Sequence, residues 1–413
     1  MSFKDLQLNK PLLRAIAESG YDNPTLVQEK TIPLVLAKKD VITSAQTVTG
    51  KTAAFALPIL QLLFDYQDAP KKGKKIKALI VSPTRELASQ IAANFKTYGK
   101  YTNLRIAVVF GGTSIEPQKD ILKKGVDILI ATPGRLLDLH KQDLVYLDFV
   151  EILVLDEADL MLDMGFIDDV KKIERLCPET KQTLLFSATI PYKVEQLANT
   201  ILNEPERIEV TPNASTSKNV NQALYYVPKK NKIELCLHLL RNTIKGNIII
   251  FRRTKFGVDK LEKSLLNNGY LADSIHGDKT QSDRQKALAN FKMNKVNILV
   301  ATDVAARGID IDNLDAVINF DLPNIPETYV HRIGRTARAG NKGVAYSFCS
   351  ADEKTYVKSI QQLIQLQLDI VEDHPYPLDP KAKPVVHKSN TPKSKYKKGR
   401  KSVASKKKKK RWY

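Results

Sequence analysis

Residues Glu151–Asp159 read EILVLDEAD, an apolar run of strand length that leads directly into three carboxylates. The apolar residues predict a buried strand, and Asp156, Glu157 and Asp159 stand at its end. Carboxylates in such a place are costly unless a cation and a proton are there to pair with them. Magnesium and water supply both, so the stretch predicts a metal-dependent hydrolytic site at the end of this strand.

A second stretch, far upstream, predicts a phosphate-binding loop. Val41–Ser44 reads as a short apolar strand, and Thr52–Phe64 has the apolar spacing of a helix. Gly50, Lys51 and Thr52 lie at the junction, where backbone N–H groups at the start of the helix can face phosphate oxygens. Lys51 would add a positive charge, and the hydroxyl of Thr52 would bind Mg²⁺.

Together, the two stretches predict nucleotide hydrolysis. We expect Asp156 to join Thr52 in binding Mg²⁺, and Glu157 to polarise the attacking water. The alternative is that the two carboxylates only cap a helix and carry surface charge. A phosphate loop upstream of them favours the catalytic interpretation.

Strand and helix patterns alternate along the chain, which indicates parallel α/β sheets. A polar stretch rich in turn-forming residues, Thr211–Asn219, separates two such series, so we expect two sheet domains joined by a linker. The first series has expected strands at 41–44, 77–82, 104–109, 126–130, 151–155 and 182–186, and the second at 223–227, 247–251, 271–275, 297–301, 316–319 and 343–348.

Length and composition agree with two or three globular domains. The chain has 413 residues, of which 43% are hydrophobic and 27% are charged. No apolar stretch is long enough to span a membrane, and the amino terminus lacks the apolar core of a signal peptide. The three cysteines, Cys177, Cys236 and Cys349, are far apart and lack metal-binding spacing, which predicts reduced thiols in a cytoplasmic protein.

Much of the positive charge lies at the carboxyl end. The net charge is +20, and the segment from Lys381 onward contains fifteen Lys or Arg and no Asp or Glu. This segment has almost no apolar residues that could form a core, so it is expected to be disordered. A solvated tail without function is one interpretation. We favour a basic arm that increases affinity for nucleic acid without reading its sequence.

A dense basic segment, HRIGRTAR, covers His331–Arg338 in the second half of the chain. Arg332, Arg335 and Arg338 recur at intervals of three, so on a continuous helix they would share one face. A solvated helix face is the simple explanation. Gly334 interrupts such a helix, and the acidic site has no arginine of its own next to its loop. We therefore expect Arg335 and Arg338 to be arginine fingers that reach across a cleft. Hydrolysis would then require closure of the two domains.

These motifs resemble those of the DEAD-box ATP-dependent RNA helicases, a superfamily 2 family, in order and spacing over nearly all of positions 1–370. Gly20–Gln28, GYDNPTLVQ, resembles the Q motif that reads adenine, and Ala45–Thr52, AQTVTGKT, resembles motif I. The DEAD tetrad at Asp156 corresponds to motif II, and Ser187–Thr189 resembles motif III, which links hydrolysis to strand separation. The resemblance implies that ATP is bound by Phe3, Gln28, Ala45, Gln46, Thr47, Val48, Thr49, Gly50, Lys51, Thr52 and Asp303.

The elements that face RNA in the family also have counterparts here. They are loops rich in Gly, Thr and Arg, which suit contacts to phosphates and 2′-hydroxyls and read base edges poorly. Binding should therefore be largely independent of sequence. The basic tail after a minimal core is most similar to the bacterial RhlE-type group. The resemblance implies RNA contacts from Pro83, Thr84, Arg85, Gly112, Thr132, Pro133, Gly134, Arg135, Gln281, Arg284 and Thr302, and coupling roles for Ser187, Thr189 and His331.

One position departs from the family pattern. Motif I has Gly in the family where this chain has Val48. If that position takes a positive φ, a β-branched residue is strained by about 1–3 kcal/mol, and nucleotide affinity or turnover suffers. If Val48 takes a negative φ, the loop is relaxed and activity is unaffected.

The resemblance implies two tandem RecA-like domains, and the sequence predicts an ATP-dependent RNA helicase that closes on ATP and RNA. Three alternatives belong to other classes: a nucleotide-gated RNA clamp with weak hydrolysis, favoured by Val48; a DNA-translocating helicase, disfavoured by the Q motif and the DEAD tetrad; and a passive basic RNA chaperone. The expected divisions are residues 1–210 for the first domain, 211–219 for the linker, 220–372 for the second domain and 373–413 for a disordered basic tail.

Overall fold

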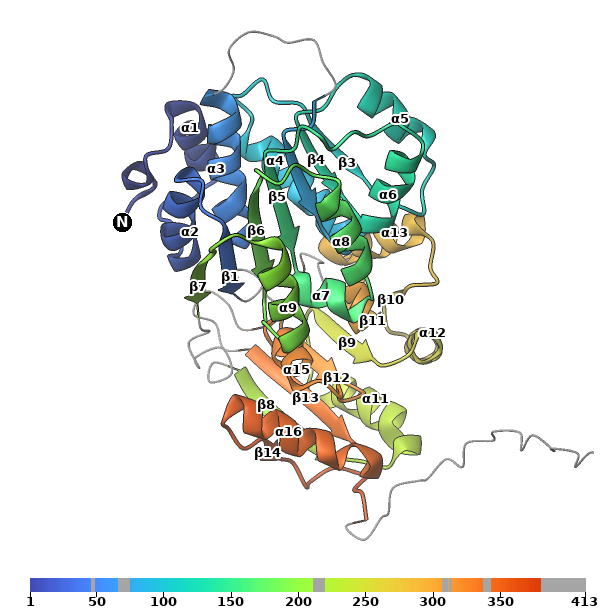
Figure 1. The fold of residues 1–413 in the computed structure, drawn as a ribbon. Helices are drawn as coiled ribbons and strands as arrows, with labels where there is room; N and C mark the ends of the chain where they lie inside the picture. Colours follow the sequence, from blue (N-terminus) through green and yellow to red (C-terminus); the bar gives the residue numbers. More distant parts are fainter. Residues whose placement is uncertain are drawn as a thin grey trace, which may run out of the picture.

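The computed structural model describes residues 1–45, 49–65, 75–210, 220–306, 311, 314–336 and 343–379. These residues form two α/β domains, one above the other in Figure 1. Gln46, Thr47, Val48, Arg338, the linker 211–219 and the tail from residue 380 lie outside the described residues, so the expectations for them stay predictions.

The first domain is built on a seven-stranded sheet in the order β3-β4-β2-β5-β6-β1-β7, in which every neighbouring pair is parallel. Its central strands are buried along their whole length, because helices cover both faces. The strands are β1 (Val41–Ala45), β2 (Ala78–Val81), β3 (Ile106–Val109), β4 (Ile128–Ala131), β5 (Ile152–Asp156), β6 (Gln182–Ser187) and β7 (Glu206–Val210).

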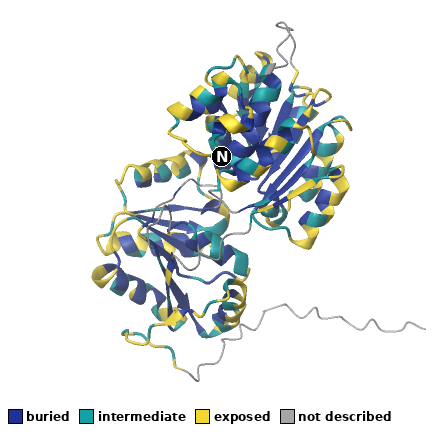
Figure 2. Ribbon diagram, turned by 90° about the vertical axis from the view of Figure 1, so that its left-hand side faces the viewer, coloured by how far each residue is buried: buried dark blue, intermediate teal, exposed yellow. Residues whose placement is uncertain are grey.

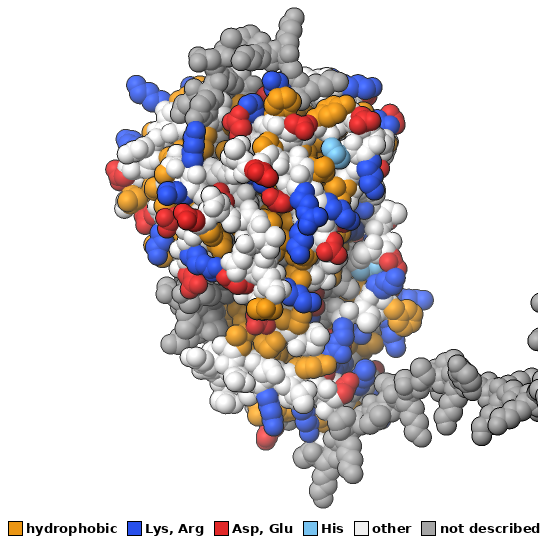
Figure 3. All heavy atoms as spheres, in the orientation of Figure 1, with side chains coloured by type: hydrophobic (Ala, Val, Ile, Leu, Met, Phe, Trp, Pro, Cys, Tyr) orange, Lys and Arg blue, Asp and Glu red, His pale blue; other side chains and the backbone are white. Residues whose placement is uncertain are grey.

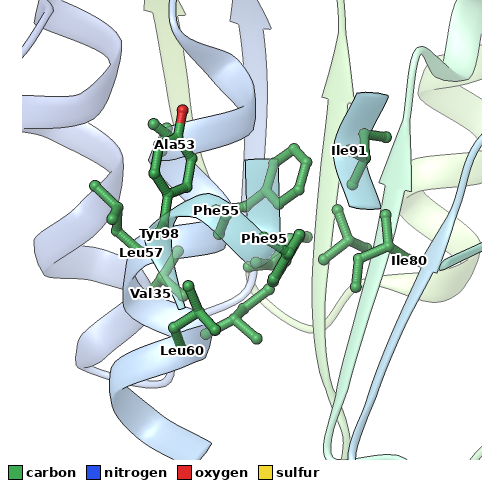
Figure 4. Close-up of a cluster of buried hydrophobic side chains, with 14 of the residues drawn as sticks. Val35, Ala53, Phe55, Leu57, Leu60, Ile80, Ile91, Phe95 and Tyr98 are labelled. Atoms are coloured by element: carbon green, nitrogen blue, oxygen red, sulfur yellow. The ribbon is translucent and has the colours of Figure 1, made fainter. Parts of the chain in front are cut away.

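Successive residues of each strand point to opposite faces of the sheet, and each face has its own core. On one face, Phe55 lies against Phe186 and Phe95 with ring centroids 5.0 and 6.1 Å apart, and Figure 4 shows Ile80 and Ile91 in the same cluster. This face is covered by η1 (Phe3–Leu6), α1 (Lys10–Glu18), α2 (Leu26–Leu36), α3 (Lys51–Asp65) and α4 (Arg85–Tyr98), and the other by α5 (Glu116–Lys123), α6 (Pro133–Lys141), α7 (Ala158–Asp163), α8 (Ile167–Arg175) and α9 (Tyr192–Ile201).

The second domain repeats this architecture with the sheet order β10-β11-β9-β12-β13-β8-β14, again with parallel neighbours. In both domains, buried strands lie between helices whose outer faces are exposed (Figure 2). The elements are β8 (Val220–Tyr226), η2 (Lys229–Asn231), α11 (Lys232–Asn242), β9 (Ile248–Arg252), α12 (Lys255–Asn267), β10 (Ala272–Ile275), α13 (Gln281–Lys292), β11 (Ile298–Thr302), α14 (Asp303–Ala306), β12 (Ala316–Asn319), α15 (Pro326–Ile333), β13 (Gly343–Cys349), η3 (Ala351–Glu353), α16 (Lys354–Ile364) and β14 (Asp369–Ile370).

The predicted α/β class and all twelve expected strands are confirmed, but two edge strands were missed. β7 reads ERIEV and β14 is only two exposed residues, so neither has the apolar run that identified the others. The second domain also continues past the expected boundary at residue 372. Tyr376 packs on its core and the N–H of Leu378 donates to the carbonyl of Tyr226 at 2.9 Å, so 373–379 is not disordered tail.

No helix among the described residues is long and apolar enough to cross a membrane. Cys177, Cys236 and Cys349 are buried free thiols, as expected, and burial raises the pKa of each to about 12.

Candidate active site and nucleic-acid interface

The phosphate loop lies between β1 and α3, where the Q motif holds its end in place. Ala45 ends β1, and Lys51 begins α3. The Gln28 amide donates to the carbonyl of Gly50 at 3.2 Å, and the hydroxyl of Thr25 donates to the carbonyl of Thr49 at 2.6 Å. Gly50 has φ +84°, and a Cβ there would lie 2.2 Å from Nε2 of Gln28, so a larger residue would be strained and would displace the Gln28 amide.

Lys51 and the first two carboxylates of the DEAD tetrad meet in a buried cluster. The Lys51 Nζ lies 2.8 Å from Oε1 of Glu157, and all three side chains are almost completely buried. Glu157 has φ 55°, a left-handed conformation that costs a non-glycine residue about 1–3 kcal/mol. This strained backbone conformation at the end of β5 directs the Glu157 side chain toward Lys51 at the phosphate loop.

The cluster has two negative charges and only one positive charge. Burial, together with repulsion from Glu157, raises the pKa of Asp156 to about 7. Burial would lower the pKa of Lys51, but attraction to Glu157 and Asp156 outweighs it and raises that pKa. A divalent cation beside Asp156 would neutralise the excess negative charge. Thr52 follows Lys51 in the first turn of α3, and its hydroxyl with the carboxylate of Asp156 forms a donor set that fits Mg²⁺.

We expect Asp156→Asn to stabilise the ligand-free protein while abolishing Mg²⁺-dependent turnover. Because the folded-state pKa of Asp156 is raised above its usual value, ionisation of this group costs stability as pH rises from about 4 to about 7. The variant lacks that loss, so above neutral pH its Tm should exceed that of the wild type by about 10 °C.

Thermal unfolding measured from acidic to alkaline pH checks this expectation. Asp168→Asn, which changes an exposed carboxylate of α8, is the matched control and should follow the wild type. The same pH dependence for Asp156→Asn and wild type would show that Asp156 does not carry this charge imbalance.

Asp159, the last residue of the tetrad, links the DEAD turn to the segment after β6. Its carboxylate accepts hydrogen bonds from the backbone N–H and the hydroxyl of Thr189 at 3.0 and 2.9 Å, and its own N–H donates to the hydroxyl of Ser187 at 3.1 Å. Burial would raise the pKa of Asp159, but Lys51, His331 and the hydroxyls of Thr189 and Ser187 together lower it. The expected coupling residues of both domains therefore surround one carboxylate.

A cavity of about 360 Å³ lies where the two domains meet on this side. Glu157, Asp159 and Thr189 line it from the first domain, and His331 and Arg335 line it from the second. Figure 1 shows α7 and α9 of the first domain next to α15 of the second. The structure thus brings the predicted catalytic carboxylate and one predicted arginine finger to the same space.

The helix of the basic segment is interrupted at Gly334, as the sequence predicted. Helix α15 ends at Ile333, two residues before Arg335. The Arg332 guanidinium is buried and donates to both oxygens of Asp303, at 2.6 and 2.8 Å. Arg332 is a structural residue that sequence reasoning missed. Its partner is the carboxylate expected at the ribose, so a role for Asp303 in binding the nucleotide stays a prediction.

A second cavity of about 360 Å³ contains most of the residues expected to bind RNA. Two helices begin here: α4 follows Thr84, whose hydroxyl accepts a hydrogen bond from the N–H of Leu87, and α6 follows Thr132. The lining residues are Pro83, Thr84, Arg85, Glu86, Gly111, Thr132, Gly134, Arg135, Met164, Phe166, Gly277, Arg284 and Val304.

Glu86 bridges the two domains at this cavity. Its carboxylate accepts a hydrogen bond from the Gln281 amide at 3.0 Å and forms an ion pair with Arg284 at 3.1 Å. The Gln281 carbonyl oxygen in turn lies 3.4 Å from Nη1 of Arg85. Sequence reasoning missed Glu86 although it directly follows Pro83, Thr84 and Arg85, because a carboxylate is not expected among phosphate-binding residues.

Two arginine N–H groups at this cavity have no hydrogen-bond partner in the described part of the chain. They are Nη1 of Arg135 and Nε of Arg284, both buried. Unpaired buried donors are costly, and phosphate oxygens would satisfy them. Gly112 has φ +70°, and a Cβ there would lie 1.8 Å from Nη2 of Arg85, so this glycine allows the arginine to approach.

Three further predicted residues are not among those that line the two cavities. Phe3 packs in the first hydrophobic cluster and is only 6% exposed, which leaves little of its ring free for adenine. Thr302 ends β11 next to Asp303, and Pro133 is the first residue of α6. Their nucleotide and RNA contacts stay predictions.

Comparisons with known proteins agree with this geometry. Residues 25–197 match the DEAD/DEAH box helicase family, and residues 231–340 match the helicase conserved C-terminal domain. The ATP-dependent RNA helicase CshA of Limosilactobacillus reuteri is 44% identical over 89% of this chain and 73% of its own length. RhpA of Helicobacter pylori is 41% identical over 90% of this chain and 74% of its own. These relatives carry other names, so the RhlE-type assignment stays a prediction.

Solved structures show the same relationship. Mss116p bound to single-stranded RNA and AMP-PNP has a TM-score of 0.81 at 32% identity, over 90% of this chain and 79% of that one. Dbp5 of Saccharomyces cerevisiae bound to RNA and ADP BeF3 has a TM-score of 0.79 at 31% identity, over 90% and 95%. A DEAD box protein from Methanococcus jannaschii has a TM-score of 0.51 at 39% identity, over 90% of this chain and 99% of that one. The chain belongs to the DEAD-box family of ATP-dependent RNA helicases.

Proposed function

We propose that this protein is an RNA-stimulated ATPase that locally unwinds or remodels RNA duplexes, and that hydrolysis is coupled to closure of its two domains on RNA. The observation that carries the proposal is the pair of cavities between the domains. One joins Glu157 to Arg335, and the other presents unpaired N–H groups of Arg135 and Arg284. Each cavity needs residues from both domains, so both sites are complete only when the domains lie together.

Binding of ATP would rearrange the buried cluster at the phosphate loop. The Lys51 Nζ pairs with Oε1 of Glu157 at 2.8 Å. The phosphates of ATP carry more negative charge than one carboxylate, so Lys51 would turn to them and release Glu157 to accept a proton from water. Mg²⁺ held by Thr52 and Asp156 would supply charge neutralisation at the phosphates.

Arg335 would act on charge that develops during the reaction. It lines the cavity from the second domain, and Glu157 lines it from the first. A guanidinium there stabilises the negative charge of the transferring phosphoryl group without taking part in proton transfer. The RNA-bound relatives have higher TM-scores than the archaeal protein although their identities are lower, which supports a closed arrangement of the two domains.

RNA would bind at the second cavity through its phosphates. Arg135 and Arg284 each offer an unused N–H, and the helices α4 and α6 begin at the cavity, so their N-terminal dipoles also favour negative charge. These groups do not read bases, so affinity should be similar for unrelated sequences. Contacts from the basic tail and a cytoplasmic location stay predictions.

The deciding experiment is the ATPase rate of the intact protein with and without single-stranded RNA, together with displacement of a short RNA duplex. We expect stimulation by RNA, little stimulation by DNA of the same sequence, and displacement that depends on ATP. A protein that binds RNA but neither hydrolyses ATP nor displaces a strand would be a clamp, and one that binds RNA without any effect of ATP would be a passive chaperone.

The clamp alternative rests on Val48, so the variant Val48→Gly should distinguish a clamp with weak hydrolysis from a fully active helicase. If the valine strains the phosphate loop, glycine should increase ATP affinity or turnover by tenfold or more, which corresponds to about 1.4 kcal/mol. ATP titrations of both proteins with saturating RNA measure the difference. Equal KM and kcat would remove the only feature that favours a clamp.

A further inference from the structure

Exposed hydrophobic side chains lie at the junction of the two domains, beside the cavity that Glu157 and Arg335 line, here called the hydrolysis cavity. Ile325 lines this cavity and is 42% exposed, and Tyr192, which is 75% exposed, follows a proline that also lines it. Figure 3 shows hydrophobic side chains gathered where α9 and α15 lie next to each other in Figure 1. Single exposed apolar residues are ordinary, but these two adjoin a cavity.

The part of the hydrolysis cavity that the proposed reaction does not use is apolar. Its apolar lining comes from both domains and consists of Leu160, Leu162, Ile190, Pro191 and Ile325. The volume of about 360 Å³ lies within the range of ligand pockets, about 300–1,000 Å³. A large apolar group seated there would contact both domains at once. It would therefore bind only the arrangement in which the two domains lie together.

The rest of the lining is predominantly acidic. Four carboxylates line the cavity: Glu157, Asp159, Asp163 and Glu327. Arg335 is the one lysine or arginine among the lining residues, and Lys51 pairs with Glu157 from outside the lining. The carboxylates still outnumber these two cations. An occupant that combines an apolar group with positive charge therefore suits this cavity.

The sequence contains such a segment outside the described residues. Lys406–Tyr413 reads KKKKKRWY, six basic residues followed by two aromatic ones, and Trp412 is the only tryptophan in the chain. The role expected for the basic tail, attraction to phosphates, accounts for the lysines. It does not account for an aromatic pair directly after them.

The chain leaves its described part at the same edge of the second sheet as the cavity. The N–H of Leu378 donates to the carbonyl of Tyr226, the last residue of β8. β8, β13 and β12 are neighbouring parallel strands, and Ile325 lies six residues after the end of β12. The residues from Pro380 to Trp412 can extend about 110 Å, so their length does not prevent docking.

We propose that Lys406–Tyr413 docks in the hydrolysis cavity of its own chain. The indole of Trp412 occupies the apolar part, where it buries a large apolar surface, and the basic run lies against the carboxylates of Asp163 and Glu327. Because the cavity needs both domains, the docked segment favours their closure in the absence of RNA. This contact goes beyond the proposed function and does not depend on hydrolysis of ATP.

The fluorescence of Trp412 tests the proposal in the full chain, which contains no other tryptophan. An indole in an apolar cavity emits at shorter wavelength than an exposed one, and acrylamide quenches it less. We expect both signs of burial without RNA, relative to a peptide of the sequence Lys406–Tyr413. Ile325→Ser removes part of the apolar lining, so it should lower the docking equilibrium about tenfold and increase the exposed fraction of Trp412.

Leu271→Ser is the matched control. Leu271 is an exposed apolar residue just before β10 in the same domain and does not line the cavity, so this variant should keep the emission of the wild type. The basic run has its own test in Glu327→Gln, which should also increase the exposed fraction of Trp412. Salt at 1 M should do the same, since it screens charges beyond about 3 Å.

Several results would overturn the docking. One is emission and quenching in the wild type equal to those of the peptide, and another is an unchanged signal in Ile325→Ser. Burial that disappears on dilution would place the segment on a second chain instead of its own. Burial that arises only after RNA is added would show that Trp412 stacks on RNA bases. RNA-stimulated ATPase measured on the same samples tests the proposed function separately, so either proposal can fail alone.

Discussion

Replacing Glu157 by Gln should reduce RNA-stimulated ATP hydrolysis by about two to four orders of magnitude, the usual contribution of a general base. The amide has the shape of the carboxylate but cannot accept the proton from the attacking water. Binding of ATP and RNA should be retained, because Lys51 pairs with the phosphates and not with residue 157 when ATP is bound. The complex of protein, ATP and RNA should therefore accumulate, which filter binding with labelled RNA and ATP can measure.

The same substitution changes the ligand-free cluster in a predictable direction. Glu157 is the second-largest cause of the raised pKa of Asp156, so removing its charge should lower that pKa from about 7. Glu151→Gln is the control, because Glu151 lies just before the same strand and is exposed. Hydrolysis by Glu157→Gln at the rate of the wild type would show that another group activates the water.

Sequence patterns predicted the fold well because buried parallel strands are apolar along their whole length. The strand that ends in Asp156 is an example. Within the nine residues Glu151–Asp159, the apolar run predicts the buried strand and the carboxylates predict the reactive site. β7 and β14 escaped prediction because they add to sheet edges, where one side meets solvent and little apolar sequence is needed.

The candidate site was predictable where one motif carries one role, and less so where partners come from distant segments. Glu86 and Gln281 are almost two hundred residues apart in sequence, and no local pattern indicates that they meet. Arg332 and Arg335 belong to the same basic segment, and their spacing does not tell a structural arginine from a finger. Only the hydrogen bonds to Asp303 show that Arg332 is structural. Roles of this kind depend on the tertiary fold and not on periodicity.

Arg335→Ala should lower kcat by about a thousandfold or more and change the KM for ATP much less. A finger that acts on charge developed in the transition state contributes to the rate and little to the ground state. Steady-state ATPase with saturating RNA measures both constants. Arg241→Ala, which removes an exposed arginine of α11 in the same domain, is the control and should match the wild type.

The neighbouring Arg332 provides a comparison, because substituting it should lower stability, whereas substituting Arg335 should lower turnover. Arg332→Ala removes a buried guanidinium that pairs with the partly exposed Asp303 and also donates to buried Asn319 and to the carbonyl of Asp321, a loss of about 3–5 kcal/mol. Its Tm should fall by about 10 °C, since each kcal/mol corresponds to about 2–4 °C in a domain of this size. Arg335→Ala should lose turnover with a much smaller change in Tm. If Arg335→Ala instead unfolds as readily as Arg332→Ala, or raises KM while keeping kcat, then Arg335 is part of the scaffold and the second domain supplies no finger from this position.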